Sequence, residues 1–450
     1  MLLRSGFLLL YSLIFVLLAP LARLLACFSP KIRGQLASRQ PVAGLAPELA
    51  RARSRKRHGV VFFCSSAGEY EQARPLIDRL SADDTVYIHV LFFSQSGCDF
   101  VKARGDLVAA TLIPASDSIW QWGWLFSALR PDIVVVVRHE LWPGFLDTAR
   151  RFARGVYLID ASRSLGETTS RAKRYFRARL LNAFTSIYTV SEADRAFFLN
   201  NYRLPPERLQ TVGDTKYDRV RERAQAKAGE SRRLREFFDG LDTPPRSKAR
   251  RRLVLGSAYR QEVELALAAR RLLGAQATLW QFVIAPHHVA ELTPWILERC
   301  QAEGLRAIRY TDLKSGAAQD STYDGAPEVI VLDTMGMLSE VYGTAEAAFV
   351  GGALHRQVHN VLEPACHGLA LAYGPFYKNS QEAVHLARSG LADIVSDAAA
   401  FAAWLEATGR RLSAGEEPPV ARALDELAGA SGRILADWRS ILGPKEEPKT

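Results

Sequence analysis

The sequence is poor in cysteine, and its cysteines do not pair. Five occur among 450 residues, at Cys27, Cys64, Cys98, Cys300 and Cys366, and no two form a Cys-x-x-Cys motif. This spacing supports neither a disulfide framework nor a zinc ribbon, so a reducing compartment fits best. The chain also lacks any repeat at a fixed period.

Long apolar runs are scarce as well, with one exception at the N-terminus. Hydrophobic residues make up 48% and charged residues 24% of the chain, as in an ordinary globular protein. This composition excludes a disordered, collagenous or polytopic membrane chain. Because single cores stop growing near ~250–300 residues, the length predicts more than one domain. The formal net charge of +10 is compatible with nucleic acid, a membrane or an acidic ligand.

The exception, Ser5 to Ala22, predicts a helical membrane anchor within residues 1–33. A run of this length is just enough to cross a hydrocarbon core of ~30 Å, while Pro20 and the marginal length leave open a helix that lies in the interface. The basic residues from Arg23 to Arg57 argue against a cleaved signal peptide. By the positive-inside rule they keep the body of the protein in the cytoplasm, beside anionic head groups.

Beyond residue 58, short β-branched runs alternate with helical patterns, which predicts parallel sheets with crossover helices. The expected strands are Val60–Cys64, Thr85–Phe93, Ile133–Val137, Gly155–Ile159, Ser186–Val190, Leu253–Leu255, Gln281–Ala285, Val329–Leu332, Ala347–Val350 and Ala370–Ala372. They predict two Rossmann-like α/β domains that face a cleft. The expected division is an N-terminal domain at 34–218, a basic linker at 219–250, a C-terminal domain at 251–415, and a helix with a tail at 416–450.

Small residues and one acid follow the first expected strand. Ser66 and Gly68 would let a ligand approach the backbone, and Glu69 falls in the first turn of the next helix. A carboxylate there can accept a proton from a substrate hydroxyl. The alternative is an ordinary capping acid.

Charged and aromatic residues follow the third expected strand, at the same edge of the sheet. Arg138, Glu140 and Trp142 could form a shaped wall beside Glu69. The alternative is that Trp142 belongs to the core and Glu140 is a paired acid.

Glycine and polar residues follow the expected strand Ala347–Val350. Gly351 and Gly352 permit close backbone contact, and Asn360 is a favoured N-cap residue before a helix whose first amides could hold a phosphate. Glu363, one turn later, could accept hydrogen bonds from a ribose diol. No second His or Cys stands at a ligand spacing from His359, so we expect no metal site.

Several motifs, taken in order, carry a family resemblance. They are Ser66-Ala67-Gly68-Glu69, Glu140-Leu141-Trp142-Pro143, Gly213-Asp214-Thr215-Lys216-Tyr217-Asp218, Asp333-Thr334-Met335-Gly336, Val350-Gly351-Gly352, His359-Asn360-x-x-Glu363-Pro364 and Gly374-Pro375. With the N-terminal apolar run, this set resembles the 3-deoxy-D-manno-octulosonic acid (Kdo) transferases of lipopolysaccharide synthesis. The resemblance covers nearly the whole chain.

The resemblance implies a GT-B glycosyltransferase that moves Kdo from CMP-Kdo to a hydroxyl of a lipid A precursor. The reaction would invert the sugar, need no cofactor and no metal on the donor, and take place on the cytoplasmic face of the bacterial inner membrane. By this resemblance Glu69 is the general base. The implied donor residues are Ser257, Gly351, Gly352, His359, Asn360 and Glu363, and the implied acceptor or cleft residues are Ser66, Gly68, Arg138, Glu140, Trp142, Lys216 and His287.

The chain also departs from the family pattern at positions expected to contact phosphate or a sugar carboxylate. Arg138 replaces an acid, Asp160 an asparagine, Tyr259 a histidine, and His287 an arginine. Met337, Gln357 and Val358 are further departures. A divergent transferase is therefore expected, possessing the proposed base but an altered donor or acceptor site.

Two other functions remain open on the sequence. One is a GT-B transferase that uses another nucleotide sugar on a different envelope lipid. The other is an inactive relative that binds lipid or acts as a scaffold, for which Arg138 and His287 are the motivation. Nucleic-acid binding is not expected, because no recognition module accompanies the positive charge.

Overall fold

The chain folds into two compact units, which we call unit 1 and unit 2. The structure, a computed structural model, describes residues 5–29, 42–104, 108–114, 116–138, 140–163, 170–241, 250–316 and 327–443. Unit 1 comprises residues 1–219 and 428–450, and unit 2 comprises residues 220–427. Part of the expected basic collar (30–41) and the C-terminal tail (444–450) lie outside the described residues.

Unit 1 is built on a parallel sheet in the order β3-β2-β1-β4-β5-β6-β7. Its strands are β1 His58–Cys64, β2 Val86–Phe92, β3 Ala109–Leu112, β4 Ile133–Val137, β5 Gly155–Ala161, β6 Ser186–Thr189 and β7 Leu209–Thr211. The helices are α1 Ser5–Phe28, α3 Val42–Ser54, α4 Ala67–Ser81, α5 Gln95–Arg104, α6 Ile119–Leu129, α7 Pro143–Phe152, α8 Arg171–Leu181, α9 Glu192–Tyr202 and α20 Ala430–Leu442.

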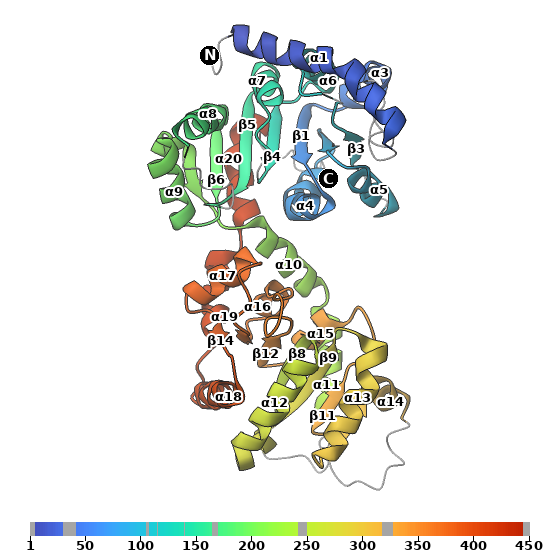
Figure 1. Ribbon diagram of the computed structural model, residues 1–450, viewed down its shortest axis with the longest axis vertical. Coiled ribbons are helices and arrows are strands. Elements are labelled where there is room, and N and C mark those ends of the chain that lie inside the picture. The colour runs from blue at the N-terminus through green and yellow to red at the C-terminus, as the bar shows by residue number, and fades with distance from the viewer. Residues whose placement is uncertain are drawn as a thin grey trace, which may run out of the picture. The chain divides into compact units, whose positions relative to one another are not determined.

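Both faces of this sheet are covered, as a parallel sheet requires (Figure 1). Val61 and Phe63 of β1 point into one core with residues of α6, α7 and α9, whereas Val60 and Phe62 point into a second core with residues of α4, α5 and α20. All seven residues of β1 are buried. The continuous apolar runs that mark the central strands in the sequence follow from this two-sided burial.

Unit 2 repeats the design with a parallel sheet in the order β10-β11-β9-β8-β12-β13-β14. The strands are β8 Arg251–Ala258, β9 Trp280–Pro286, β10 Ala307–Arg309, β11 Val329–Val331, β12 Ala347–Val350, β13 Ala370–Tyr373 and β14 Asp393–Ile394. The helices are α11 Ala228–Asp239, α12 Arg260–Leu273, α13 Val289–Ala302, α14 Tyr310–Ser315, α15 Leu338–Tyr342, α16 Leu362–Cys366, α17 Gln381–Arg388, α18 Ala398–Ser413 and α19 Pro419–Leu427. Two parallel α/β units are what the GT-B resemblance implies, and this part of the expectation is confirmed.

The segment 219–250 is not the plain linker that the sequence suggested. It contains most of α10 (Thr215–Ala226) and all of α11, and Leu234 and Phe238 of α11 lie in the core of unit 2. Arg235 of α11 also pairs with Glu346 at 2.9 Å. The many arginines concealed an amphipathic helix, because only three or four apolar positions are needed to bury one helical face.

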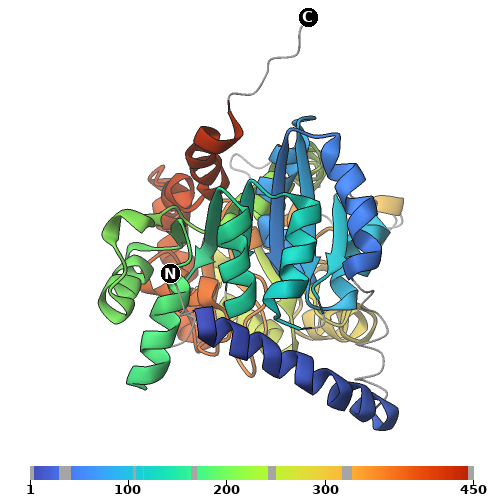
Figure 2. The same ribbon diagram turned by 90° about the horizontal axis from the view of Figure 1, so that it is seen from above.

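Helix α1 lies along unit 1, against α6 and α7 (Figure 2). Leu8 and Ser12 are buried, the Tyr11 hydroxyl donates to Asp117 Oδ2 at 3.1 Å, and the amide of Ile119 donates to Ser12 Oγ at 3.2 Å. Elsewhere the helix exposes a row of large apolar side chains: Phe7, Leu9, Leu10, Leu13, Ile14, Val16, Leu17 and Leu18. Among the described residues, no helix combines the length and the apolar character needed to cross a membrane.

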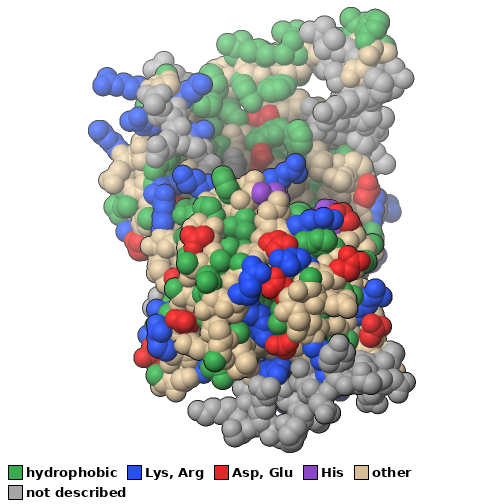
Figure 3. Space-filling model, turned by 60° about the horizontal axis from the view of Figure 1, so that its bottom comes forward, with side chains coloured by type: hydrophobic (Ala, Val, Ile, Leu, Met, Phe, Trp, Pro, Cys, Tyr) green, Lys and Arg blue, Asp and Glu red, His purple; other side chains and the backbone are tan. Residues whose placement is uncertain are grey.

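The positive charge is spread among acidic groups on the face that Figure 3 shows, where Lys and Arg alternate with Asp and Glu. Among the described residues of unit 2, Arg271 pairs with Glu303, and Arg299 pairs with Glu264 at 2.8 Å. Partly exposed pairs of this kind contribute little to stability.

Candidate active site

The two sheets place their loops at equivalent points. In the sheet of unit 1, strands β2 and β3 are added on one side of β1, and strands β4 to β7 are added on the other side. The direction of strand order therefore reverses between the neighbouring strands β1 and β4. In unit 2 the same reversal lies between β8 and β12. Ligands of such sheets bind beyond the carboxyl ends of the strands at this reversal. The loops after β1 and β4, and those after β8 and β12, carry most of the residues that the sequence singled out.

Glu69 lies in the first turn of α4, next to the loop that follows β1. The N-cap hydroxyl of Ser66 accepts from the Glu69 amide, and Glu69 Oε2 accepts from the amide and, at 2.7 Å, from the hydroxyl of Ser65. Burial raises the pKa of Glu69 above its usual value, the hydrogen bonds from Ser65 lower it, and nearby Glu140 raises it. The bond to the Ser65 amide is what a capping acid makes. The raised pKa is what a proton acceptor needs.

Gly68 stands one residue into the same helical turn, where space is open. A Cβ at Gly68 would find only Ser66 Oγ within 4 Å, at 3.7 Å. The smallness of this residue is therefore not required by packing within the described structure.

The loop after β4 carries Arg138, Glu140 and Trp142. Arg138 has a φ of 65°, a left-handed conformation that is uncommon outside glycine and is found in turns and at functional sites. Trp142 Nε1 donates to Glu140 Oε2 at 2.6 Å, and the Trp142 ring packs edge-on against Phe63. The structure thus shows the paired acid and the packed indole that the sequence left open as the plain alternative. His139 lies outside the described residues.

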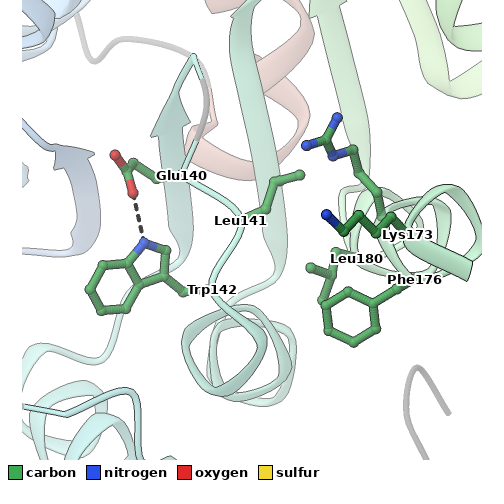
Figure 4. A pocket seen from close by; sticks show the side chains of 7 residues that line it. Glu140, Leu141, Trp142, Lys173, Phe176 and Leu180 are labelled. Atoms are coloured by element: carbon green, nitrogen blue, oxygen red, sulfur yellow. Dashed lines mark hydrogen bonds between the residues drawn. The ribbon is translucent and has the colours of Figure 1, made fainter. Parts of the chain in front are cut away.

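A cavity of about 400 Å³ opens beside this loop (Figure 4). One wall is Glu140, Leu141 and Trp142, and the other is one side of α8, with Lys173, Phe176, Arg177 and Leu180. The cavity therefore combines two cations with apolar surface. Phe176 also contacts Phe7 of α1, with ring centroids 6.1 Å apart, so the exposed apolar face of α1 begins next to this cavity.

The end of β5 holds a second strained residue, Asp160, with a φ of 53°. Its Oδ1 accepts from the Thr215 amide at 2.9 Å and its Oδ2 from the Thr215 hydroxyl at 2.6 Å. Complete burial and the neighbouring Asp214 raise the pKa of Asp160 to about 7. Lys216, the second residue of α10, donates its amide to Asp214 Oδ1 at 2.8 Å. Asp160 thus holds the start of the helix that carries Lys216.

In unit 2, the loops after β8 and β12 approach each other at backbone distance. A Cβ on Gly351 would lie 2.3 Å from the carbonyl oxygen of Ser257, and one on Gly352 would lie 2.3 Å from that of Gln357. Ser257 and Gly352 both have positive φ, of 53° and 88°. The Gly352 amide donates to Glu262 Oε1 at 3.0 Å. Gly351 is therefore required by the close packing between the two loops, and Gly352 by the tight turn of its own loop.

His359, Asn360 and Glu363 follow on the same loop. Asn360 Oδ1 accepts from the Leu362 amide at 3.0 Å, yet the N-cap residue of α16 is Val361 and the helix has only five residues. The expectation that Asn360 is the N-cap is therefore wrong, and so short a helix offers no extended row of amides for a phosphate. Burial raises the pKa of Glu363, while the charges of Arg223 and Lys227 lower it.

The expected site residues thus divide between the units. Unit 1 carries Ser66, Gly68, Glu69, Arg138, Glu140, Trp142 and Lys216. Unit 2 carries Ser257, Gly351, Gly352, His359, Asn360 and Glu363, together with His287, which we had expected on the acceptor side. His287 stacks on His359 with ring centroids 4.5 Å apart. In the part of the chain that the structure describes, no three His, Cys, Asp or Glu side chains are placed to share a metal ion.

Sequence reasoning missed the cations of the cavity and His355, whose ring contacts Tyr259. Lys173 and Arg177 belong to a basic helix whose pattern resembles any solvated helix. Tyr259 and His355 come next to the Ser257 and Gly352 loops, so proximity along the chain was the available signal.

A family model described as 3-deoxy-D-manno-octulosonic-acid transferase (kdotransferase) matches residues 41–219. A 3-deoxy-D-manno-octulosonic acid transferase of Haemophilus influenzae is 25% identical over 365 residues, which cover 80% of this chain and 79% of that protein. A bifunctional glycosyltransferase/methyltransferase of Fusobacterium nucleatum is 24% identical over 322 residues, covering 70% of this chain but 47% of the relative.

Among solved structures, UDP-GlcNAc 2-epimerase from Neisseria meningitidis bound to UDP-GlcNAc has the same fold. It aligns with a TM-score of 0.52 at 14% identity, covering 85% of this chain and all of the epimerase. At this identity the likeness concerns the fold alone. The family model and the Haemophilus influenzae relative both point to the Kdo transferases, so the chain is similar in sequence to that family.

Proposed function

We propose that this protein transfers Kdo from CMP-Kdo to a hydroxyl group of a lipid A precursor, with inversion at the sugar. The observation that carries the proposal is Glu69, a half-buried carboxylate that is held by Ser65, has a raised pKa and lies at the strand-order reversal of unit 1. The raised pKa brings its proton affinity closer to that useful for a base at neutral pH. The family relationship makes Kdo the sugar to test first.

In the proposed reaction the acceptor hydroxyl gives its proton to the Glu69 carboxylate. The hydroxyl oxygen bonds to the anomeric carbon of Kdo from the face opposite the phosphate. The bond between that carbon and the phosphate oxygen breaks, and CMP leaves with the bonding electrons. Because CMP is a good leaving group, the acceptor side needs a base, and the donor side needs groups that bind phosphate. No cofactor and no metal on the donor are part of this proposal.

We assign the donor to unit 2. Ser257, Gly351 and Gly352 lie at the carboxyl ends of β8 and β12, where the two loops are closely packed and a nucleotide could bind beside them. Asn360 and Glu363 lie next to them, and a Glu363 carboxylate can accept hydrogen bonds from a ribose diol. The position at the strand-order reversal supports this assignment, since nucleotides bind there in sheets of this kind.

We assign the acceptor to the cavity of unit 1. Its apolar wall suits an acyl-bearing sugar, and Lys173 and Arg177 suit a phosphate on that sugar, Arg through paired N–H groups and Lys as a point charge. The contact between Phe176 and Phe7 supports a route from a lipid surface, because it joins the cavity to the exposed apolar face of α1.

We propose further that α1 lies in the cytoplasmic interface of the inner membrane. One side of the helix packs on unit 1 through Leu8 and Ser12, and a row of large apolar side chains is exposed. That arrangement fits a helix lying parallel to the membrane surface. The basic residues that follow α1 would be drawn to anionic lipid.

The test is the mass of the product formed by purified full-length protein with CMP-Kdo and a tetraacylated lipid A precursor. Addition of Kdo is expected, and Glu69→Gln should lower turnover by ~10²–10⁴ while CMP still binds. The matched control is Glu192→Gln, which changes an exposed acid in the first turn of α9 and should keep full activity.

The outcomes separate the candidate functions. If the protein binds CMP but modifies no lipid A acceptor, the proposal that lipid A is the acceptor is contradicted. A marked rise of the melting temperature with UDP or GDP, but not with CMP, would favour the alternative nucleotide sugar. Nucleotide binding without any turnover dependent on Glu69 would point to the inactive relative.

A further inference from the structure

Five aromatic and imidazole rings gather at the carboxyl ends of β8, β9 and β12 in unit 2. This ring cluster consists of Tyr259, His287, His288, His355 and His359. It is reached from three separate segments of the chain, which meet beside the Gly351 and Gly352 backbone. Nothing in the family resemblance or in the site described above assigns a role to the cluster as a whole.

The centre of the cluster consists of three rings, Tyr259, His287 and His359, whose planes are nearly parallel. His359 Nε2 and the Tyr259 hydroxyl are 3.2 Å apart and hydrogen-bonded, with the ring planes 16° apart. His287 stacks on both, with ring centroids 4.6 Å from Tyr259 and 4.5 Å from His359. His288 and His355 meet the group edge-on, at 4.7 Å from His287 and from Tyr259 respectively.

The loops under the rings are held by a buried acid. The carboxylate of Glu262 accepts from the Tyr259 amide at 2.9 Å and from the Gly352 amide at 3.0 Å, and its side chain is wholly buried. His355 Nδ1 stands 4.0 Å from the same carboxylate. Glu262 therefore fixes the two loops on which Tyr259 and His355 stand, and contributes a negative charge close to His355.

Other charged groups surround the cluster on every element that forms it. They are Arg260 of α12 and Glu291 of α13, which pair at 3.4 Å, and Arg356 of the loop after β12, which acts on the Tyr259 hydroxyl. The Arg260 guanidinium also lies over the Trp295 ring, 5.1 Å from its centroid. Arg260 is thus engaged by Glu291 and Trp295, whereas the positive charge of Arg356 acts on the Tyr259 hydroxyl.

The unliganded cluster disfavours positive charge on its own imidazoles. Burial lowers the pKa of His359, and His287 and His355 lower it further. Burial and His288 lower the pKa of His287. Both rings are consequently neutral at pH 7, and a proton is bound only when a negative ligand compensates for burial and for the neighbouring rings. Because two cations 4.5 Å apart repel each other, the pair takes up one proton rather than two.

We propose that the ring cluster binds the phosphate of the CMP group and takes up one proton as it does so, so that donor affinity rises as the pH falls. This inference rests on the proposed CMP-sugar donor. Once protonated, His359 donates both ring N–H groups, one toward the Tyr259 hydroxyl and the other toward a phosphate oxygen. His287, stacked on His359, stays neutral while His359 carries that proton, because two adjacent cations would repel each other. A fixed guanidinium at position 287 would bind phosphate without this proton.

Isothermal titration of the full-length protein with CMP tests the inference. Titrations at pH 6 and pH 8, each in two buffers of different ionisation enthalpy, give the affinity and the number of protons taken up. Full coupling to one proton changes the affinity tenfold per pH unit, hence up to ~100-fold over this interval. The CMP phosphate itself titrates near pH ~6, which affects every variant alike, so the comparison between variants isolates the protein.

The variants are His287→Arg, with His385→Gln of α17 as the matched control and His287→Gln as a second change. The ratio of the CMP affinity at pH 6 to that at pH 8 should be at least tenfold larger for wild type and His385→Gln than for His287→Arg. His287→Gln should bind CMP weakly at both pH values. Cytidine, which lacks the phosphate, should bind equally at pH 6 and pH 8.

Equal pH dependence in wild type and His287→Arg, or equal proton uptake, overturns the inference while leaving a CMP donor in place. Failure of CMP to bind wild type at either pH removes the proposed donor as well, and this inference with it. The circular dichroism spectrum of each variant shows whether it is folded, and His287→Gln keeps the test decisive if His287→Arg is not.

Discussion

Replacing Asp160 by asparagine should stabilise unit 1 at alkaline pH and remove part of its pH dependence. Asp160 is buried, and burial together with Asp214 raises its pKa to about 7. The folded state therefore holds a proton that the unfolded chain, with a carboxyl pKa of ~3.9, has released above pH ~5. Stability from this group is fully present below pH ~4 and is lost as the pH rises through 7.

The magnitude follows from the two pKa values. One proton bound only by the folded state makes the free energy of unfolding fall by ~1.4 kcal/mol per pH unit, or by about 2–3 kcal/mol between pH 5 and pH 8. Asparagine cannot ionise, so the Asp160→Asn variant loses this slope. Its carbonyl oxygen can still accept from the Thr215 amide, and its amide can donate to the Thr215 hydroxyl in place of the bond that Asp160 now accepts. Asparagine also tolerates the left-handed φ of 53°.

The assay is urea unfolding of wild type and variant at pH 5, 6, 7 and 8. Hydrogen exchange of peptides from β5, compared between proteins at each pH, assigns the change to unit 1. The stability difference in favour of Asp160→Asn should grow by about 2–3 kcal/mol from pH 5 to pH 8. The control Asp99→Asn, on the exposed side of α5, should show a constant difference. A constant difference for Asp160→Asn too, or a loss of stability at pH 8, would refute the reasoning.

Three further predictions concern the site and helix α1. The rate of Kdo transfer should rise with pH through an apparent pKa above ~4.3, because burial raises the pKa of Glu69 and only its ionised form accepts a proton; a pH–rate profile without this limb contradicts a base at Glu69. Gly352→Ala should abolish CMP binding and lower the melting temperature, because the new Cβ would lie 2.3 Å from a carbonyl oxygen. The control Gly390→Ala, at a glycine with positive φ but open space, should lower the free energy of unfolding by only ~1–2 kcal/mol. Equal effects of the two variants in thermal unfolding would argue against the close approach. Leu17→Asp should weaken flotation with vesicles that contain anionic lipid, whereas Leu272→Asp, at an isolated exposed leucine of α12, should not; equal flotation of both variants would contradict an interfacial α1.

The central strands could be predicted from the sequence, and the edge strands could not. Every expected strand is present, and the four that were missed are β3, β7, β10 and β14. These four are the edges of the two sheets, and each is two to four residues long. An edge strand is half exposed and needs no apolar run, so its residues look like loop until a neighbouring strand is known.

The same contrast applies to the site. Loops after buried strands could be located, which gave Glu69, Arg138, Gly351 and His359. Residues that reach a site from the side of a helix gave no signal, as with Lys173 of α8. Their contribution depends on which helical face points at the cavity, and that is decided by tertiary packing.

The position of α20 in unit 1 has a consequence for the order in which the protein folds during synthesis. Ile434 and Trp438 complete a core whose other residues are made hundreds of positions earlier, and Tyr188 is hydrogen-bonded to Asp437. Unit 2 has its whole chain once Leu427 has been made, whereas unit 1 lacks part of its core until the last helix leaves the ribosome. The half that is synthesised first is therefore the half that finishes folding last. Until then, its sheet face and the apolar α1 are nascent-chain surfaces that chaperones or the membrane itself must cover.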